Sequence, residues 1–126
     1  MFDAHAAPEN QDQIPLNWPA APNGERDNAK AQELVDKAHL AFTSGRFETA
    51  VSLNTELLRI KPADARVLFN RGVAYYRLRD LNSALSDFNA SLELAPDLYL
   101  ALMNRGNVLS QFKRYDEAIA DYGRAV

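Results

Sequence analysis

The stretch Leu68–Pro96 reads LFNRGVAYYRLRDLNSALSDFNASLELAP, and it decides how the rest of the chain is interpreted. It contains two segments with an apolar residue pattern of helical period, and the small residues Gly72 and Ala84 lie inside them. A shift of 34 residues gives the similar stretches LVDKAHLAFTSGRFETAVSLNTELLRIKP from Leu34 and LMNRGNVLSQFKRYDEAIADYGRAV from Leu102. A unit of this length cannot bury its own apolar face, so we expect the copies to stack.

Residues 34 positions apart agree in type along the repeated region. The agreement includes small residues in the middle of the expected helices. A glycine inside a helix costs roughly 0.5–1 kcal/mol relative to alanine, so Gly72 and its counterpart Gly106 indicate that helices cross closely there. The aligned sets are Leu34, Leu68 and Leu102; Ala38, Gly72 and Gly106; Phe47, Leu81 and Tyr115; and Ala50, Ala84 and Ala118.

The periodic segments predict an all-α fold with short breaks between the helices. The expected helices cover about residues 27–44, 47–60, 65–78, 81–94, 98–112 and 115–126. Breaks of only two to four residues force consecutive helices to lie antiparallel. Three helices are expected to begin after an aspartate N-cap, at Asp27, Asp64 and Asp97.

The repeated pattern resembles the tetratricopeptide repeat family over about residues 31–126. The resemblance implies a right-handed superhelical array of three antiparallel helix pairs, the third incomplete, in which the first helix of each pair lines a concave groove for an extended peptide. The first copy departs from the pattern at Ala38, Ala41 and Asn54. The residues that carry the resemblance are Leu68, Gly72, Tyr75, Ala84, Phe88 and Pro96, then Leu102, Gly106, Leu109, Ala118 and Tyr122.

Two regions of different composition divide the chain into an arm, residues 1–26, and an array, residues 27–126, with repeats at about 31–64, 65–98 and 99–126. The arm is rich in proline and carries four acids and one base, a net charge of −3, whereas the array carries 13 charges of each sign. Two interpretations of the arm stand. It is a disordered tail, or its segment Ile14–Pro19, which holds the only tryptophan, docks on its own array or on a neighbour's.

A second set of matched residues predicts two structural ion pairs, Arg71–Asp87 and Arg105–Asp121. Each arginine precedes a packing glycine on the first helix of a pair, and each aspartate lies at the matching place on the second helix. In the first copy both partners are replaced, by Lys37 and by a leucine. Because arginine and aspartate are present together and absent together, we expect them to pair; the alternative is that the arginines contact a ligand.

Helical spacing also predicts which side chains face the groove. Several of them are apolar and unusual on a solvated face, which suits a peptide with apolar side chains. Asparagine side chains at matching places can bind its main chain, since each offers donors and an acceptor. The alternative for each apolar residue is a place in the core between the helix layers. The candidate groove residues are Phe69, Asn70, Val73, Tyr76, Arg77, Met103, Asn104 and Asn107.

One activity of the family can be tested against these residues. Family members that clamp a chaperone's C-terminal carboxylate use lysines, an arginine and asparagines along this groove. Here only Asn70 matches, and Val35, His39, Leu100 and Asn104 occupy the other places. The sequence therefore argues against that ligand.

The remaining composition argues against catalysis, cofactors and metals. There is no cysteine, the two histidines are far apart, and the glycines form no phosphate-binding loop. A neutral array with an acidic arm argues against nucleic acid. No apolar run is long enough to cross a membrane, and no signal peptide is evident, although an already cleaved exported protein would look the same. A soluble protein, cytoplasmic by default, is expected.

These observations predict a non-enzymatic module for protein–protein interaction, an adaptor or scaffold that binds a protein or peptide partner. The alternative is a self-assembling structural protein. The last helix carries Ile119, Tyr122 and Val126 at helical spacing with no following helix to cover them. Either the chain is a fragment of a longer array, or the arm or this helix forms a homodimer.

Overall fold

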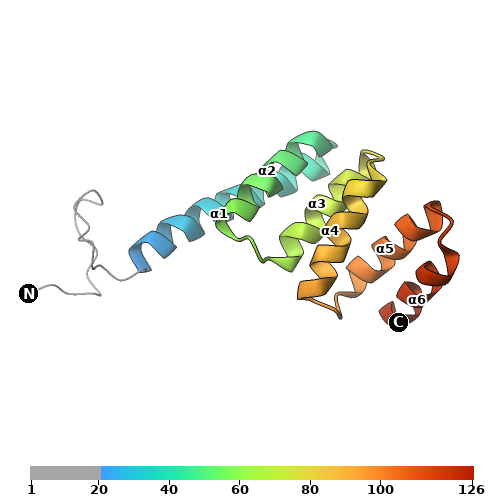
Figure 1. Cartoon of the computed structure of the whole chain (residues 1–126). Coiled ribbons are helices and arrows are strands. Elements are labelled where there is room, and N and C mark those ends of the chain that lie inside the picture. Colours follow the sequence, from blue (N-terminus) through green and yellow to red (C-terminus); the bar gives the residue numbers. More distant parts are fainter. Residues whose placement is uncertain (1–20) are drawn as a thin grey trace, which may run out of the picture.

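The computed structural model describes residues 21–126, and these form six α-helices joined by turns of three or four residues (Figure 1). The described residues contain no strand. The helices are α1 Ala21–Thr43, α2 Phe47–Ile60, α3 Ala65–Arg77, α4 Leu81–Leu94, α5 Tyr99–Gln111 and α6 Tyr115–Ala125. The predicted all-α fold is confirmed.

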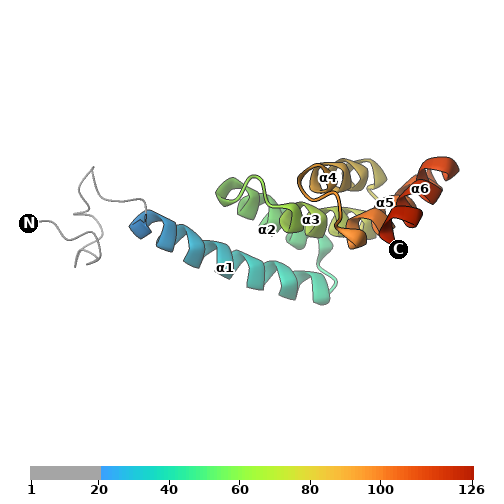
Figure 2. The ribbon, with the colours of Figure 1, turned by 90° about the horizontal axis from the view of Figure 1, so that it is seen from below.

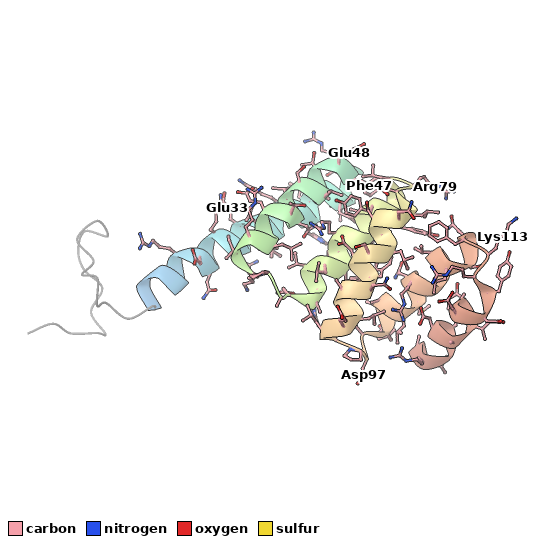
Figure 3. All side chains as sticks on the ribbon, viewed as in Figure 1. Glu33, Phe47, Glu48, Arg79, Asp97 and Lys113 are labelled. Atoms are coloured by element: carbon pink, nitrogen blue, oxygen red, sulfur yellow. The ribbon has the colours of Figure 1, made fainter. Side chains whose placement is uncertain are left out.

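The helices form three antiparallel pairs, α1 with α2, α3 with α4 and α5 with α6. The pairs follow one another in single file because α2 packs on α3 and α4 packs on α5 (Figures 1 and 2). Turns within a pair and turns between pairs lie at opposite ends of the helices, as the labelled Arg79 and Asp97 at the two ends of α4 show (Figure 3). Among the described residues, only the middle pair, α3 with α4, has a neighbouring pair on each side.

The start of the first helix differs from the prediction. Helix α1 begins at Ala21, so Asp27 lies inside the helix and is not its N-cap. Pro22 is tolerated because it occupies the first turn, where a backbone N–H has no partner within the helix. The predicted arm therefore contributes its last residues to α1. Residues 1–20, including Ile14–Pro19, lie outside the described residues.

The predicted caps are partly correct. The Asp64 carboxylate accepts hydrogen bonds from the N–H groups of Arg66 and Val67, at 3.0 and 3.3 Å. Asp97 does not cap α5, because the chain turns into the helix one residue later and Leu98 is the N-cap. Asp80, which was not predicted as a cap, accepts from the Ser83 N–H at the start of α4.

Close approach of two helices explains the matched glycines. A Cβ atom added to Gly72 would lie 2.8 Å from Phe88 Cε1, and one added to Gly106 would lie 2.6 Å from Tyr122 Cε1. Phe88 is fully buried and packs with Ala84 and with residues of α5. The glycines therefore admit an aromatic ring from the second helix of each pair, as the repeat pattern predicted.

Gly72→Ala is expected to lower the free energy of unfolding by about 1–3 kcal/mol, because the added methyl group overpacks against the buried Phe88 ring. The higher helix propensity of alanine offsets part of this loss. Gly123→Ala is the matched control, because Gly123 is also helical but has open space around it. That change should stabilise the protein by up to about 1 kcal/mol. Urea unfolding followed by circular dichroism measures both, and effects of the same sign would contradict the packing explanation.

The turns inside the helix pairs contain a residue with left-handed backbone. In the first pair this residue is Gly45, with φ 76°, but in the others it is Arg79, with φ 65°, and Lys113, with φ 62°. A residue with a Cβ atom pays roughly 1–2 kcal/mol in this conformation. Arg79→Gly is therefore expected to raise the melting temperature, whereas Arg46→Gly, at a φ of −90°, should not. Equal effects of the two changes would contradict this account.

Candidate functional site

A groove of about 950 Å³ runs along one face of the array. Its walls come from α1 and α3, its floor includes residues of α2, and α5 contributes at one side. Apolar atoms make up most of its surface, although eight of the fifteen lining residues are polar or charged. The lining consists of Val35, Asp36, Ala38, His39, Phe42, Thr43, Asn54, Leu57, Asp64, Arg66, Val67, Phe69, Asn70, Val73 and Asn104.

Half of the candidate groove residues lie in this lining: Phe69, Asn70, Val73 and Asn104. Phe69 and Val73 are half-buried: each lines the groove and also packs against the core. The Asn70 side chain is exposed and forms no hydrogen bond with the described part of the chain. Asn104 donates from Nδ2 to the Leu100 carbonyl oxygen at 2.7 Å.

Two candidates on α3 lie outside the lining because other parts of the array engage them. The Arg77 guanidinium lies over the Phe47 ring, 4.7 Å from its centroid, and 5.8 Å from that of Phe42. The Tyr76 hydroxyl oxygen accepts a hydrogen bond from Gln111 Nε2 at 2.6 Å. Spacing on one helix did not reveal these contacts, because their partners lie on α1, α2 and α5.

The two remaining candidates, Met103 and Asn107 on α5, are also absent from the lining. The Asn107 carbonyl oxygen accepts a hydrogen bond from the Tyr122 hydroxyl at 2.6 Å, which ties it to α6. Met103 is exposed. The groove thus lies nearer to the first two pairs than the sequence predicted.

The floor of the groove contains residues that spacing did not assign to it. Ala38 and Asn54 are two of the positions at which the first copy departs from the repeat pattern. Asn54 stands where the other copies have Phe88 and Tyr122, and its Nδ2 donates to the Ala50 carbonyl oxygen at 2.9 Å. A smaller side chain at this place leaves space that an aromatic ring fills in the other pairs. The departure of Ala38 and Asn54 from the repeat pattern is therefore the sequence signal that could have placed them in the groove floor.

Electrostatically, the groove is close to neutral. Asp36, Asp64 and Arg66 are its charged residues, which gives −2 + 1 = −1 with His39 neutral. The Asp64 carboxylate is already occupied by the N-terminal N–H groups of α3. The lining therefore offers no cluster of cations to an acidic ligand.

Both predicted ion pairs are present. Arg71 donates to Asp87 from Nε and from a terminal nitrogen, each at 2.8 Å, and to the Thr55 hydroxyl at 3.1 Å. Arg105 holds Asp121 in the same way at 2.6 and 2.7 Å. The hydrogen bonds with the carboxylates raise the pKa of both arginines above the usual value, although burial opposes this. Neither arginine lines the groove, which favours a structural role.

The outer face of α6 is apolar and uncovered among the described residues. Ile119 is 65% exposed, whereas Leu85, its counterpart 34 residues earlier, is half-buried beneath the next pair. Tyr115 is also exposed. Both explanations of this face, a continuing array or self-association, remain compatible with its exposure.

The described residues contain neither a candidate membrane-spanning helix nor a candidate metal site. No described helix is long and apolar enough to cross a membrane. No group of three or more histidine, aspartate or glutamate side chains is placed to hold a metal ion within residues 21–126.

The comparisons with known proteins agree with the repeat and the fold. A model of the tetratricopeptide repeat family matches residues 35–99 and 75–126. The chain therefore belongs to the tetratricopeptide repeat family.

Among the curated relatives, the chain is 32% identical to the protein SGT1 homolog of Oryza sativa subsp. japonica over 92 residues, 73% of the chain and 25% of the relative. It is 31% identical to human DnaJ homolog subfamily C member 7 over 100 residues, 75% of the chain and 20% of the relative. The chain thus spans a quarter or less of these two relatives.

Solved structures show the same arrangement of helices. The first tetratricopeptide domain of Spaghetti (RPAP3), bound to the HSP90 peptide SRMEEVD, superposes with a TM-score of 0.74 at 29% identity over 77% of each chain. The TPR2B domain of yeast Sti1, in a complex with pHsp70, gives a TM-score of 0.74 at 28% identity over 77% of this chain and 78% of that one.

Proposed function

We propose that the array is a protein-interaction module that holds a short extended segment of a partner protein in the groove, without catalysis. The observation that carries the proposal is the groove itself, a hollow with a mostly apolar surface, which includes the Asn70 amide; this amide has no hydrogen-bond partner within residues 21–126. An apolar face of this kind needs cover. The HSP90 peptide bound to a similar domain supports a peptide as that cover.

The ligand is uncharged and partly apolar. Val35, His39 and Leu100 stand where family members that clamp an acidic C-terminus have charged or amide groups, and the lining sums to −1. An acidic tail such as SRMEEVD would find one cation in the lining, Arg66, and two carboxylates, Asp36 and Asp64. Apolar side chains, in contrast, would be desolvated by Val35, Phe69 and Val73, and burial of apolar area contributes about 25 cal/mol per Å².

The main chain of the ligand pairs with the amide side chains. Asn70 offers two N–H donors and one acceptor beside the apolar wall. Asn104 lies across the groove on α5 and keeps its carbonyl oxygen as an acceptor after donating to Leu100. An extended segment that runs between them can bury its side chains without leaving its own backbone groups unpaired, which would cost about 1–3 kcal/mol each.

A matched pair of peptides tests the charge argument. Fluorescence anisotropy would compare SRMEEVD with SQMQQVN carrying a C-terminal amide, both labelled at the N-terminus. The second peptide carries no charged group and keeps the methionine and valine. The uncharged peptide is expected to bind more tightly, and its affinity should change little as salt rises from about 50 to about 500 mM. Tighter, salt-sensitive binding of SRMEEVD would contradict the proposed ligand class.

Val35→Asp tests the position of the site. Val35 is 42% exposed on the groove wall, so the change places a charge against the ligand with little cost to folding. It is expected to weaken binding of the uncharged peptide at least about tenfold. Leu40→Asp is the matched control, since Leu40 is 66% exposed on the same helix outside the groove. Equal losses in the two variants would place the peptide elsewhere.

A further inference from the structure

We propose that the groove of one copy also binds the segment Ile14–Pro19 of a second copy, so that this segment competes with partner peptides. The inference rests on the proposed function, because it supplies the same groove with a second, built-in ligand. Three observations carry it: the chemistry of the segment, the chemistry of the groove and the distance between them.

The segment has the properties that the groove selects. Residues 13–20 read QIPLNWPA and carry no charge. Ile14, Leu16 and Trp18 alternate with other residues, so an extended chain presents them on one side. Two prolines interrupt any helix and reduce the entropy lost when the segment becomes extended. Uncharged apolar side chains suit a lining whose charges sum to −1.

The length of α1 determines whose groove the segment can reach. Helix α1 is continuous from Ala21, and its first groove residue, Val35, is 14 residues further on, about 21 Å at 1.5 Å per residue. Trp18 precedes Ala21 by three residues, and its Cα reaches at most about 11 Å from that end. It therefore falls about 10 Å short of Val35, more than the length of an indole side chain.

The other two apolar residues, Leu16 and Ile14, are about 18 and 25 Å of extended chain from Ala21, so their side chains can come level with Val35 in their own copy. The N-terminal part of α1 projects beyond the other helices in both ribbon views (Figures 1 and 2). A second copy imposes no such limit. All three side chains can come level with Val35 together only in another molecule.

Trp18 reports the docking directly, because it is the only tryptophan in the chain. Its emission is expected to shift to shorter wavelength as the concentration of the full chain rises from about 1 to about 100 µM, in step with an increase in mass by light scattering. A shift that does not depend on concentration would show docking within one copy and overturn the inference. Emission of an exposed tryptophan from a monomer throughout would also overturn it.

Mixing two variants identifies the donor and the acceptor. Val35→Asp retains Trp18 but has a damaged groove, and Trp18→Phe has an intact groove but no tryptophan signal. Alone, the Val35→Asp chain should show exposed emission. Adding the Trp18→Phe chain in excess should shift that emission to shorter wavelength, and no shift on mixing would overturn the inference. Leu40→Asp, the control, should behave as the unchanged chain does.

Failure of this inference can be told apart from failure of the proposed function. If Trp18 stays exposed in every mixture while the uncharged peptide still binds and Val35→Asp still weakens it, the groove is a peptide site and only the second-copy ligand is wrong. If neither Trp18 nor the peptide binds, both proposals are wrong. If Trp18 docks, deleting residues 1–20 should tighten binding of the uncharged peptide, because a competitor is removed.

Discussion

Asp87→Ala is expected to lower the free energy of unfolding by about 3 kcal/mol or more. The Asp87 side chain is 6% exposed and its Arg71 partner 21% exposed, so removing the carboxylate strands a partly buried guanidinium. Arg71 would retain its hydrogen bond with the Thr55 hydroxyl and its contact with the Tyr75 ring, 5.8 Å from the ring centroid, but no anionic partner in the pair. Urea unfolding of the single variants and of the double variant would give the coupling energy of the pair.

The double variant Arg71→Met, Asp87→Leu is the informative control. Replacing a buried ion pair with apolar groups of similar volume is often neutral, because the desolvation cost of two charges disappears with their attraction. The first repeat supports this, since it has Lys37 and Leu53 at these places and still pairs α1 with α2. If the double variant were as unstable as Asp87→Ala, the attraction within the ion pair would itself stabilise the fold, beyond avoiding the cost of one unpaired charge.

Phe88→Ala is expected to cost about 3–5 kcal/mol. Phe88 is fully buried, fits against Gly72 and lies 5.9 Å from the Phe69 ring between centroids. Removing the Phe88 ring leaves a cavity in the middle pair, the one pair among residues 21–126 that has a neighbouring pair on each side. Denaturant unfolding followed by far-UV circular dichroism would measure the loss.

Tyr122→Ala is the matched comparison, because Tyr122 holds the same place in the last pair and packs against Gly106. It is only half-buried, since no described helix covers α6. Its removal should therefore cost clearly less than that of Phe88. Equal costs would contradict the view that stability comes from stacking on both faces of a pair.

The repeat made the interior of the array predictable from sequence. Gly72, Ala84 and Phe88 recur with a fixed period because each pair must fit the next, and the ion pairs followed from residues present or absent together. The start of α1 was not predictable by the same means. Proline usually marks a helix boundary, but Pro22 lies in the first turn, where its lack of an N–H has little consequence.

The groove was only partly predictable, because its members depend on contacts between helices. Helical spacing correctly placed Phe69, Asn70 and Val73 on the groove side of α3. Spacing could not show that Arg77 is held by an aromatic ring of α2, nor that Asn54 of α2 forms part of the floor. Both depend on how far neighbouring pairs rotate against each other, which no single helix encodes.

The central claim is that the groove along α1 and α3 is the binding surface. Titration of the ¹⁵N-labelled chain with the uncharged, N-acetylated SQMQQVN amide, followed by two-dimensional NMR, tests it most directly. If the peptide binds in the groove, amide shifts are expected to concentrate at His39, Asn70 and Val73, with little change on α6. Shifts confined to the uncovered face of α6 around Ile119 would contradict it.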